Sequence, residues 1–245
     1  MAKKVAIVQS NYIPWKGYFD LLNLADEFIL YDTAQYTKND WRNRNRIKTP
    51  NGPAWLTIPV RHKHLSQTIK ETRATNCIWR KKHWKTLQEN YKKAPYFINY
   101  VDIFGSLLLG SRDMCLSVIN NKFLYAIRDL LGSTTKITQS SDYALISGKT
   151  ERIVSLCKQA GASEYISGPA AKSYLRQELF EEAGIKVSWM DYSGYPEYRQ
   201  LFPPFVHEVS ILDLLFNEGP KASKYMKSFG KTEHSRTSSS SDGGS

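Results

Sequence analysis

At 245 residues the chain is long enough to bury a sizeable core, and with 41% hydrophobic and 23% charged residues its composition is typical of a soluble globular protein. Lys and Arg number 34 against 23 Asp and Glu, and the formal charge of +11 favours an anionic partner, either nucleic acid, a phosphorylated ligand or an anionic membrane surface. No apolar run is long enough to span a bilayer, and the one near the N-terminus is too short for a signal peptide, so we expect a cytoplasmic protein without a membrane span.

The chain begins with the pattern of a βαβ unit. Residues 3–9 form a short run rich in β-branched residues, which indicates a buried strand. A loop and a helix with spaced apolar residues follow, and residues 27–36 form a second buried strand that carries Asp32 at its end. Strand, helix and strand in this order predict an α/β fold with a parallel sheet.

The middle of the chain has hairpin and helix signals. Residues 41–49 and 53–61 read as two strands joined by Pro50-Asn51-Gly52, a strong turn signal, and residues 67–74 are suited to a third strand. The pattern then becomes helical from about 79 to 131 and stops at Gly132. We therefore expect a β-hairpin insertion at about 41–75 and a helical segment at about 79–131.

The second half repeats helix and strand. A strand is expected at 135–143, and helices that stop at Gly161 and Gly184 are each followed by another strand. A last helix ends at Gly219, and residues 229–245 have no apolar face and are expected to be disordered. The prediction is a Rossmann-like parallel sheet in a single α/β domain over residues 1–228.

The loop after the first strand is a candidate ligand site, because ligands bind at the carboxyl ends of strands in open α/β sheets. Gln9, Asn11 and Tyr12 lie at that end, Lys16 has the reach to contact a phosphate, and Gly17 permits close approach of the backbone. The alternative is a tight turn capped by aromatic residues. Neither a GxGxxG nor a Walker sequence is present, so a dinucleotide fold or a P-loop kinase is not supported.

Two other predicted strand ends carry polar residues. Asp32 is placed to bind a ribose or sugar hydroxyl, and the alternative is a turn or N-cap carboxylate. Ser167 and Gly168 follow a strand and precede a helix, which is a junction suited to anions.

Basic residues alternate along the first strand of the predicted hairpin. Residues two apart share a face of an extended chain, so one face carries the cations Arg42, Arg44, Arg46 and Lys48. The other face, directed at the core or a pocket, carries Trp41, Asn43 and Asn45. Arg suits phosphate, and amides with an aromatic face suit hydroxyls and rings, although a solvated strand face has the same pattern.

Histidine and cysteine patterns give little support for metal binding. No His pair has metal-ligand spacing, and the three cysteines form neither CxxC nor a Cys/His cluster, so we expect no metal site. His83 is a candidate general base, and the alternative is a partly buried structural histidine.

Several stretches together resemble the WbqC-like family over most of residues 5–220. The matching stretches are QSNYIPWKGYFDL, DEFILYD, QYTKNDWRNRNRIKTPNG, WLTIPV, YISGPAAKSYL and VSILDLLFNEG. The motif positions that carry over are Gln9, Tyr12, Gly17, Asp32, Trp41, Arg42, Asn43 and Arg44, without individual roles. The opening stretch is also similar to nucleotidyltransferase-like α/β folds, but PWKGY stands where those enzymes have an HxGH pattern, so adenylyl or cytidylyl transfer is not supported.

The resemblance implies an enzyme of bacterial surface-polysaccharide (O-antigen) biosynthesis that acts on a nucleotide-linked amino sugar. N-acyl or aminoacyl transfer onto the sugar amine would need an acyl or aminoacyl donor, such as an acyl-CoA or a carrier-protein thioester, and no other cofactor is indicated. His83 or Asp32 would take the proton from the amine. The predicted substrate-binding residues are Gln9, Asn11, Tyr12, Lys16, Gly17, Tyr36, Trp41, Arg42, Asn43, Arg44, Ser167 and Gly168.

Two other functions remain open. A non-catalytic nucleic-acid-binding or scaffold protein explains the charge and the interleaved aromatics, but it explains less well why the arginines come with Asn and Gln beside a βαβ loop. A glycosyltransferase is the third alternative, and the chain lacks an obvious DxD-like metal motif. We therefore favour the nucleotide-linked sugar over nucleic acid as the partner.

Overall fold

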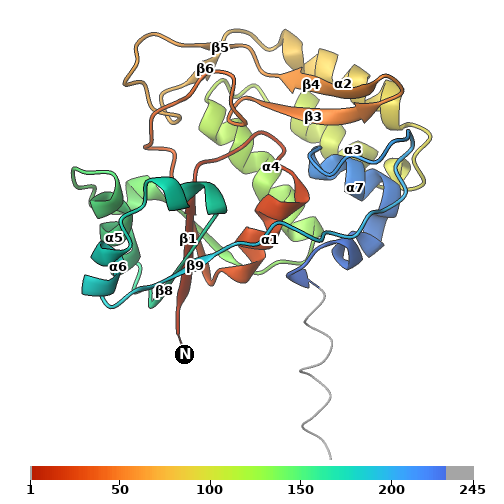
Figure 1. Cartoon of the computed structure of the whole chain (residues 1–245). Coiled ribbons are helices and arrows are strands. Elements are labelled where there is room, and N and C mark those ends of the chain that lie inside the picture. Colours follow the sequence, from red (N-terminus) through yellow and green to blue (C-terminus); the bar gives the residue numbers. More distant parts are fainter. Residues whose placement is uncertain (1, 230–245) are drawn as a thin grey trace, which may run out of the picture.

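A five-stranded parallel sheet lies at the centre of the computed structural model, which describes residues 2–229. Its strands are β1 (Lys4–Val8), β2 (Glu27–Leu30), β7 (Lys136–Gln139), β8 (Glu164–Ser167) and β9 (Lys186–Trp189), in the spatial order β7-β2-β1-β8-β9 (Figure 1). This confirms the expected α/β fold with a Rossmann-like sheet. The predicted disordered tail lies, from residue 230 on, outside the described residues.

Alternation along the strands distributes apolar side chains to both faces of the sheet. In β1, Val5 and Ile7 pack into one buried cluster, whereas Ala6 packs into another on the opposite face. β2 does the same, with Ile29 on the first side and Phe28 on the second. Strands that are apolar on both faces need helices on both faces, which is the reason for the layered arrangement.

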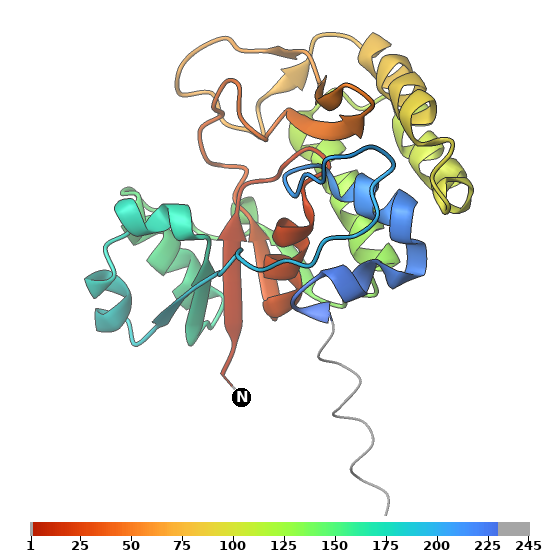
Figure 2. The ribbon, with the colours of Figure 1, turned by 45° about the vertical axis from the view of Figure 1, so that its right-hand side comes forward.

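Helices cover the two faces separately. α1 (Lys16–Leu24) and α4 (Leu116–Leu130) pack on one face, together with α7 (Ile211–Glu218). α5 (Thr150–Gln159) and α6 (Glu178–Glu182) pack on the other, and the two groups lie on opposite sides of the sheet in Figures 1 and 2. No helix within residues 2–229 is long and apolar enough to cross a membrane.

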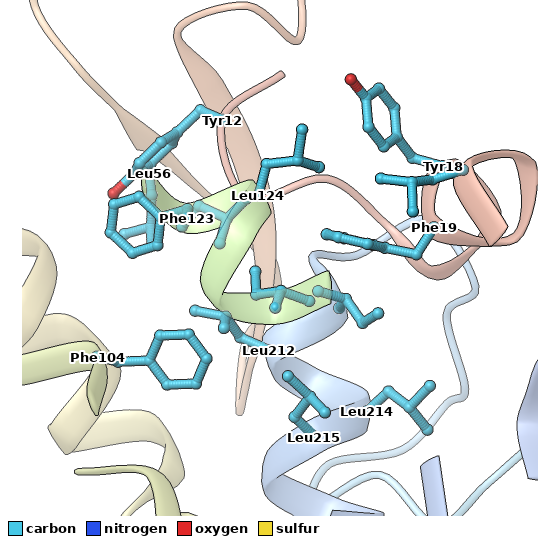
Figure 3. Close-up of a cluster of buried hydrophobic side chains, with 14 of the residues drawn as sticks. Tyr12, Tyr18, Phe19, Leu56, Phe104, Phe123, Leu124, Leu212, Leu214 and Leu215 are labelled. Carbon is cyan, nitrogen blue, oxygen red and sulfur yellow. The ribbon is translucent and has the colours of Figure 1, made fainter. Parts of the chain in front are cut away.

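The larger buried cluster joins segments that are far apart in the sequence. Figure 3 shows Leu212, Leu214 and Leu215 of α7 beside Phe123 and Leu124 of α4, with side chains from α1 and from the loop after β1 in the same cluster. The final part of the chain is therefore packed onto the first βαβ unit.

An insertion between β2 and α4 carries the predicted hairpin and helices. The hairpin is β3 (Arg44–Thr49) and β4 (Gly52–Thr57), and Gly52 has the positive φ of +95° that the turn requires. Its remaining elements are β5 (Val60–Arg61), β6 (Arg73–Ala74), α2 (Ile78–Tyr91) and α3 (Phe97–Leu109). The third predicted strand is reduced to β6, which pairs with β5 and not with the hairpin.

The strand order and the 190–210 loop together bring distant parts of the chain to the carboxyl ends of the strands. The chain runs from β1 outward to β2 and β7 and then returns to β8 on the other side of β1, so the order reverses between β1 and β8. This topological switch point is where open α/β sheets bind ligands. Residues 190–210, which contain no helix or strand, form a long loop that ends against β3, where the Ser210 N–H donates to the Arg46 carbonyl at 2.8 Å.

The part of the chain that the structure describes also contains three short 3₁₀ segments: η1 (Ser140–Asp142), η2 (Pro169–Ser173) and η3 (Gly219–Tyr225). η2 follows β8 directly and so borders the switch point.

Candidate functional site

A buried polar network fixes the backbone at the switch point. The Asp32 carboxylate, 2% exposed, accepts a hydrogen bond from the Ser10 N–H at 2.8 Å and another from the Ser117 hydroxyl. Asn120 donates to the Ser10 hydroxyl at 3.1 Å and to the Arg42 carbonyl at 2.9 Å. Ser117 and Asn120 belong to the first turns of α4, so the helix locks the loops after β1 and β2 and the chain at Arg42 into one unit.

Asp32 therefore fixes the position of the loop after β1. Both of its oxygens already accept hydrogen bonds, and the side chain is shielded from solvent. This arrangement suits a residue that orients the loop after β1, and its predicted role as a proton acceptor stays a prediction.

Arg42 is the cation that reaches the switch point. Its Nη1 donates to Asn11 Oδ1 in the loop after β1, and its Nη2 lies 3.5 Å from Asp40 Oδ2. The side chain is only 13% exposed, and its Nε has no hydrogen-bond partner among the described residues. Burial lowers the pKa of Arg42 from its usual value, opposed chiefly by the nearby Asp40 carboxylate.

A buried guanidinium that forms one ion pair with a carboxylate among residues 2–229, at 3.5 Å, is an incompletely compensated charge. The Asp32 carboxylate also acts on the pKa of Arg42, but its two oxygens already accept hydrogen bonds from Ser10 and Ser117. Such a position suits an anionic group bound between the ends of β1 and β8.

The backbone at the end of β8 is partly exposed at Gly168. Ser167 is buried, and Gly168 adopts extended backbone with φ of −70°. A Cβ added at Gly168 would meet only the Tyr192 side chain, at 3.7 Å from its hydroxyl oxygen, so the fold itself does not require a glycine here. Tyr192 in turn packs edge-on against Trp15, with ring centroids 5.2 Å apart.

A small pocket adjoins Arg42 on the side of the hairpin. Its volume is about 150 Å³, and its lining residues are Asn11, Pro14, Trp15, Trp41, Asn45 and Glu208. Asn11 therefore lines the pocket with its side chain already bound to Arg42. Asn45 also lines the pocket, and its amide donates to the carbonyls of Tyr12 at 3.1 Å and Ile13 at 2.8 Å.

The predicted cationic stripe is not one surface. β3 begins only at Arg44, so Arg42 lies outside the strand and turns to Asn11. Arg44 stacks on Trp55, with its guanidinium carbon 4.2 Å from the ring centroid, and Arg46 lies 3.7 Å from the Glu208 carboxylate. Lys48 is 1% exposed and donates to a carbonyl of the 190–210 loop.

His83 lies in the core beneath the hairpin. Its Nε2 contacts the Thr57 carbonyl at 3.2 Å, and because a carbonyl only accepts, Nε2 carries the proton and Nδ1 accepts from the Tyr12 hydroxyl at 2.9 Å. Burial lowers the pKa of His83 to about 4, so the ring is neutral at pH 7. The same burial places Tyr12, another predicted binding residue, in the core with 0% exposure. Both ring nitrogens of His83 therefore already have hydrogen-bond partners. The proton transfer by His83 stays a prediction.

Other predicted residues also have packing roles. The Lys16 ammonium donates to the Pro196 carbonyl at 3.0 Å and is 2% exposed. Gly17 permits a close approach to its backbone, and the group that approaches is the Trp15 indole and not a ligand. A Cβ at Gly17 would lie 2.3 Å from the indole. The Tyr36 hydroxyl donates to Asn43 Oδ1 at 3.0 Å.

The structure thus brings some predicted residues together and separates others. Asn11, Arg42, Ser167, Gly168 and the backbone of Gln9 lie at the switch point, with Trp41 at the adjoining pocket. Sequence reasoning missed Ser117, Asn120, Tyr192, Trp15 and Glu208. Among residues 2–229, no three His, Cys, Asp or Glu side chains lie close enough to hold a metal ion.

Comparisons with known proteins agree with the resemblance noted in the sequence. The model of the WbqC-like protein family matches residues 9–225. A protein from Mycobacterium tuberculosis (strain ATCC 25618 / H37Rv), described as uncharacterized protein Rv1507c, is 51% identical over 226 residues, which cover 92% of this chain and 98% of the relative. No solved structure matches the chain.

Proposed function

The chain belongs to the WbqC-like protein family, and from the geometry of its site we propose that it is an enzyme that binds a nucleotide-linked amino sugar with the diphosphate at the switch point. The observation that carries the proposal is the position of Arg42. Its guanidinium is mostly buried at the carboxyl ends of the strands, it is held in place by Asn11, and its carboxylate partner is only loosely placed.

The diphosphate would lie between the ends of β1 and β8. Arg42 would bind its oxygens with charge-assisted hydrogen bonds, and Gly168 would let the phosphates approach the backbone. The Asp32 network would keep the loop after β1 fixed during binding. A diphosphate is the group best suited to this buried guanidinium beside a backbone where an added Cβ would meet only Tyr192.

The reaction proposed is transfer of an acyl or aminoacyl group from a thioester onto the sugar amine, within surface-polysaccharide biosynthesis in the cytoplasm. The neutral amine attacks the acyl carbon, a C–N bond forms, the C–S bond breaks, and the thiol leaves with a proton from the amine. Because the chemistry needs two bound substrates in contact, positioning supplies much of the rate. The diphosphate anchor is the part of that positioning that Arg42 supports.

The test is binding of uridine, thymidine and guanosine diphosphates and their sugars, measured by calorimetry at low and high salt. Arg42→Gln should weaken binding of the preferred diphosphate roughly 10- to 100-fold, as expected for loss of a charged hydrogen bond. The matched variant Arg199→Gln removes an equally charged but exposed side chain and should leave binding unchanged. Equal binding by wild type and Arg42→Gln would refute the diphosphate site.

A second candidate function rests on the hairpin surface. Trp41 and Trp55 are 38% and 45% exposed, their rings lie 5.4 Å apart, and Arg44 stacks on Trp55. Exposed aromatics with arginine suit the stacked bases of single-stranded nucleic acid. Oligonucleotide binding that falls steeply with salt and is lost in Trp55→Ala, without diphosphate binding, would favour this alternative.

A further inference from the structure

The pocket beside Arg42 has the size of a single ring. Pockets for drug-sized ligands span ≈ 300–1,000 Å³, and this one is about 150 Å³. It therefore has room for one ring-sized group and not for a base together with its ribose. Asn11 links this space directly to the guanidinium of Arg42.

Two tryptophans form rigid walls of the pocket. Trp41 packs against Trp55, and the Arg44 guanidinium packs on the ring of Trp55. Trp15 is held against α1 over Gly17 and by Tyr192. The π faces of tryptophan attract cations more strongly than those of the other aromatic residues, so these walls favour a ring that carries a positive charge.

Glu208 supplies the complementary anion. The Arg46 Nε holds the main-chain carbonyl of Glu208 at 3.1 Å, which fixes the position of the residue at the pocket. The carboxylate itself is 68% exposed, and its Oε2 is 3.7 Å from Arg46, beyond hydrogen-bond distance. Within residues 2–229 the carboxylate accepts no hydrogen bond and forms an ion pair only with Arg46, so it can bind a ligand.

Asn45 and Asn11, the other two polar residues of the pocket, differ in whether their side chains can still form a hydrogen bond with a ligand. Asn45 already uses its amide on two carbonyls and its Oδ1 on the Arg46 N–H. Among the residues that the structure describes, the Asn11 side chain bonds only through Oδ1, to Arg42, which leaves its NH₂ group to donate to a hydroxyl. The pocket therefore offers one donor for a hydroxyl and one carboxylate for a cation.

We propose that this pocket is the subsite for the amino-sugar ring and that Glu208 selects an amine over a hydroxyl by binding the ammonium between Trp15 and Trp41. The inference rests on the proposed function, because the ring is connected to the diphosphate at Arg42. Transfer of a proton from the bound ammonium to the Glu208 carboxylate would give the neutral amine that attacks the acyl carbon of the second substrate.

The experiment compares matched pairs of ligands by calorimetry with the full chain. UDP, UDP-glucose and UDP-glucosamine form one set, because the sugars differ only in a hydroxyl or amine, and the corresponding thymidine and guanosine sets cover the choice of base. The wild type should prefer the amino sugar at least tenfold. Glu208→Gln should abolish that preference and leave binding of the nucleoside diphosphate within about twofold of wild type.

Two controls keep the outcomes separate. Glu197→Gln removes an exposed carboxylate from the same loop and should retain the preference. If the diphosphate binds but amino and hydroxyl sugars bind equally, or Glu208→Gln keeps the preference, the pocket assignment is overturned. If no nucleoside diphosphate binds at all, the proposed function fails, and free glucosamine against glucose at millimolar concentration then tests the pocket alone: a preference lost in Glu208→Gln upholds it, and its absence overturns it.

Discussion

Lys16 is the buried charge whose removal gives the sharpest test of the structure. Its ammonium donates to the Pro196 carbonyl at 3.0 Å and lies over the rings of Tyr195 and Tyr198, 4.9 and 5.2 Å from their centroids. Burial lowers the pKa of Lys16 to about 8, partly opposed by the Asp20 carboxylate. In Lys16→Met the charge is absent, and in Lys16→Gln a neutral donor to Pro196 remains.

The sign of the pH effect follows from the lowered pKa. The unfolded chain keeps Lys16 protonated up to about pH 10.5, whereas the folded protein releases the proton from about pH 8 upward. Between these values the unfolded state binds more protons, so the contribution of Lys16 to stability rises with pH, and it is lost as the pH falls through 8. One pKa unit corresponds to about 1.4 kcal/mol, so the free energy of unfolding of wild type relative to Lys16→Met should rise by about 2 kcal/mol between pH 8 and pH 10.

The assay is urea unfolding of wild type, Lys16→Met and Lys16→Gln at half-unit steps from pH 7 to pH 10. Burial raises the pKa values of Cys157 and of the buried tyrosines in the folded protein, so these groups titrate near this range only in the unfolded chain. They are present in all three proteins and cancel in the difference. Both variants should give the same slope against wild type, and both should bind UDP as wild type does, because the ammonium faces the loop. A difference that changes by less than about 0.5 kcal/mol over the range would refute the burial argument, and loss of UDP binding in Lys16→Gln would restore Lys16 as a phosphate ligand.

Three other predictions concern stability and the switch point. Burial raises the pKa of Glu27, but hydrogen bonds, the first of them from Lys3, outweigh it and bring the pKa to about 2. The stability from Glu27 is therefore present above about pH 4.5 and lost as the pH falls toward 2, and urea unfolding of Glu27→Gln at pH 7 should show a loss of about 2–3 kcal/mol. Gly17→Ala should cost about 1–3 kcal/mol in the same assay, because the added methyl overlaps the Trp15 indole, and an unchanged midpoint would contradict that contact. Gly168→Ala should leave the melting temperature unchanged but weaken diphosphate binding by calorimetry about tenfold or more, and unaltered affinity would place the phosphates elsewhere.

The regular elements could be predicted because their signals are local. Gly161 and Gly184 end α5 and α6 with φ of +69° and +67°, as the pattern of helix followed by glycine indicates. β1 and β2 were recognisable because strands buried on both faces are continuously apolar. β5 and β6 have only two residues each, too few for any periodicity, so their pairing depends on tertiary contacts.

The site was harder to predict because its residues acquire their roles only through packing. Alternation at Arg42 requires an extended chain, but Asn39 has a φ of +57° and β3 begins only at Arg44, two residues after Arg42. Ser117 and Asn120 have the appearance of ordinary polar helix residues until α4 docks its first turns onto the loops after β1 and β2. Nothing in the sequence near Glu208 connects it to Arg42.

The 190–210 loop connects the stability of the fold to the specificity proposed for the pocket. The loop has no regular hydrogen bonding of its own, so its shape depends on buried polar anchors: the Tyr195 hydroxyl donates to Asp20 at 2.6 Å, and the Tyr198 hydroxyl donates to Asp213 at 2.8 Å. Glu208 lies at the end of this loop, whereas Arg42 is fixed independently through Asn120. Loosening an anchor should therefore affect selection of the sugar amine while the diphosphate site stays intact, because Glu208 and Arg42 are held by different hydrogen bonds.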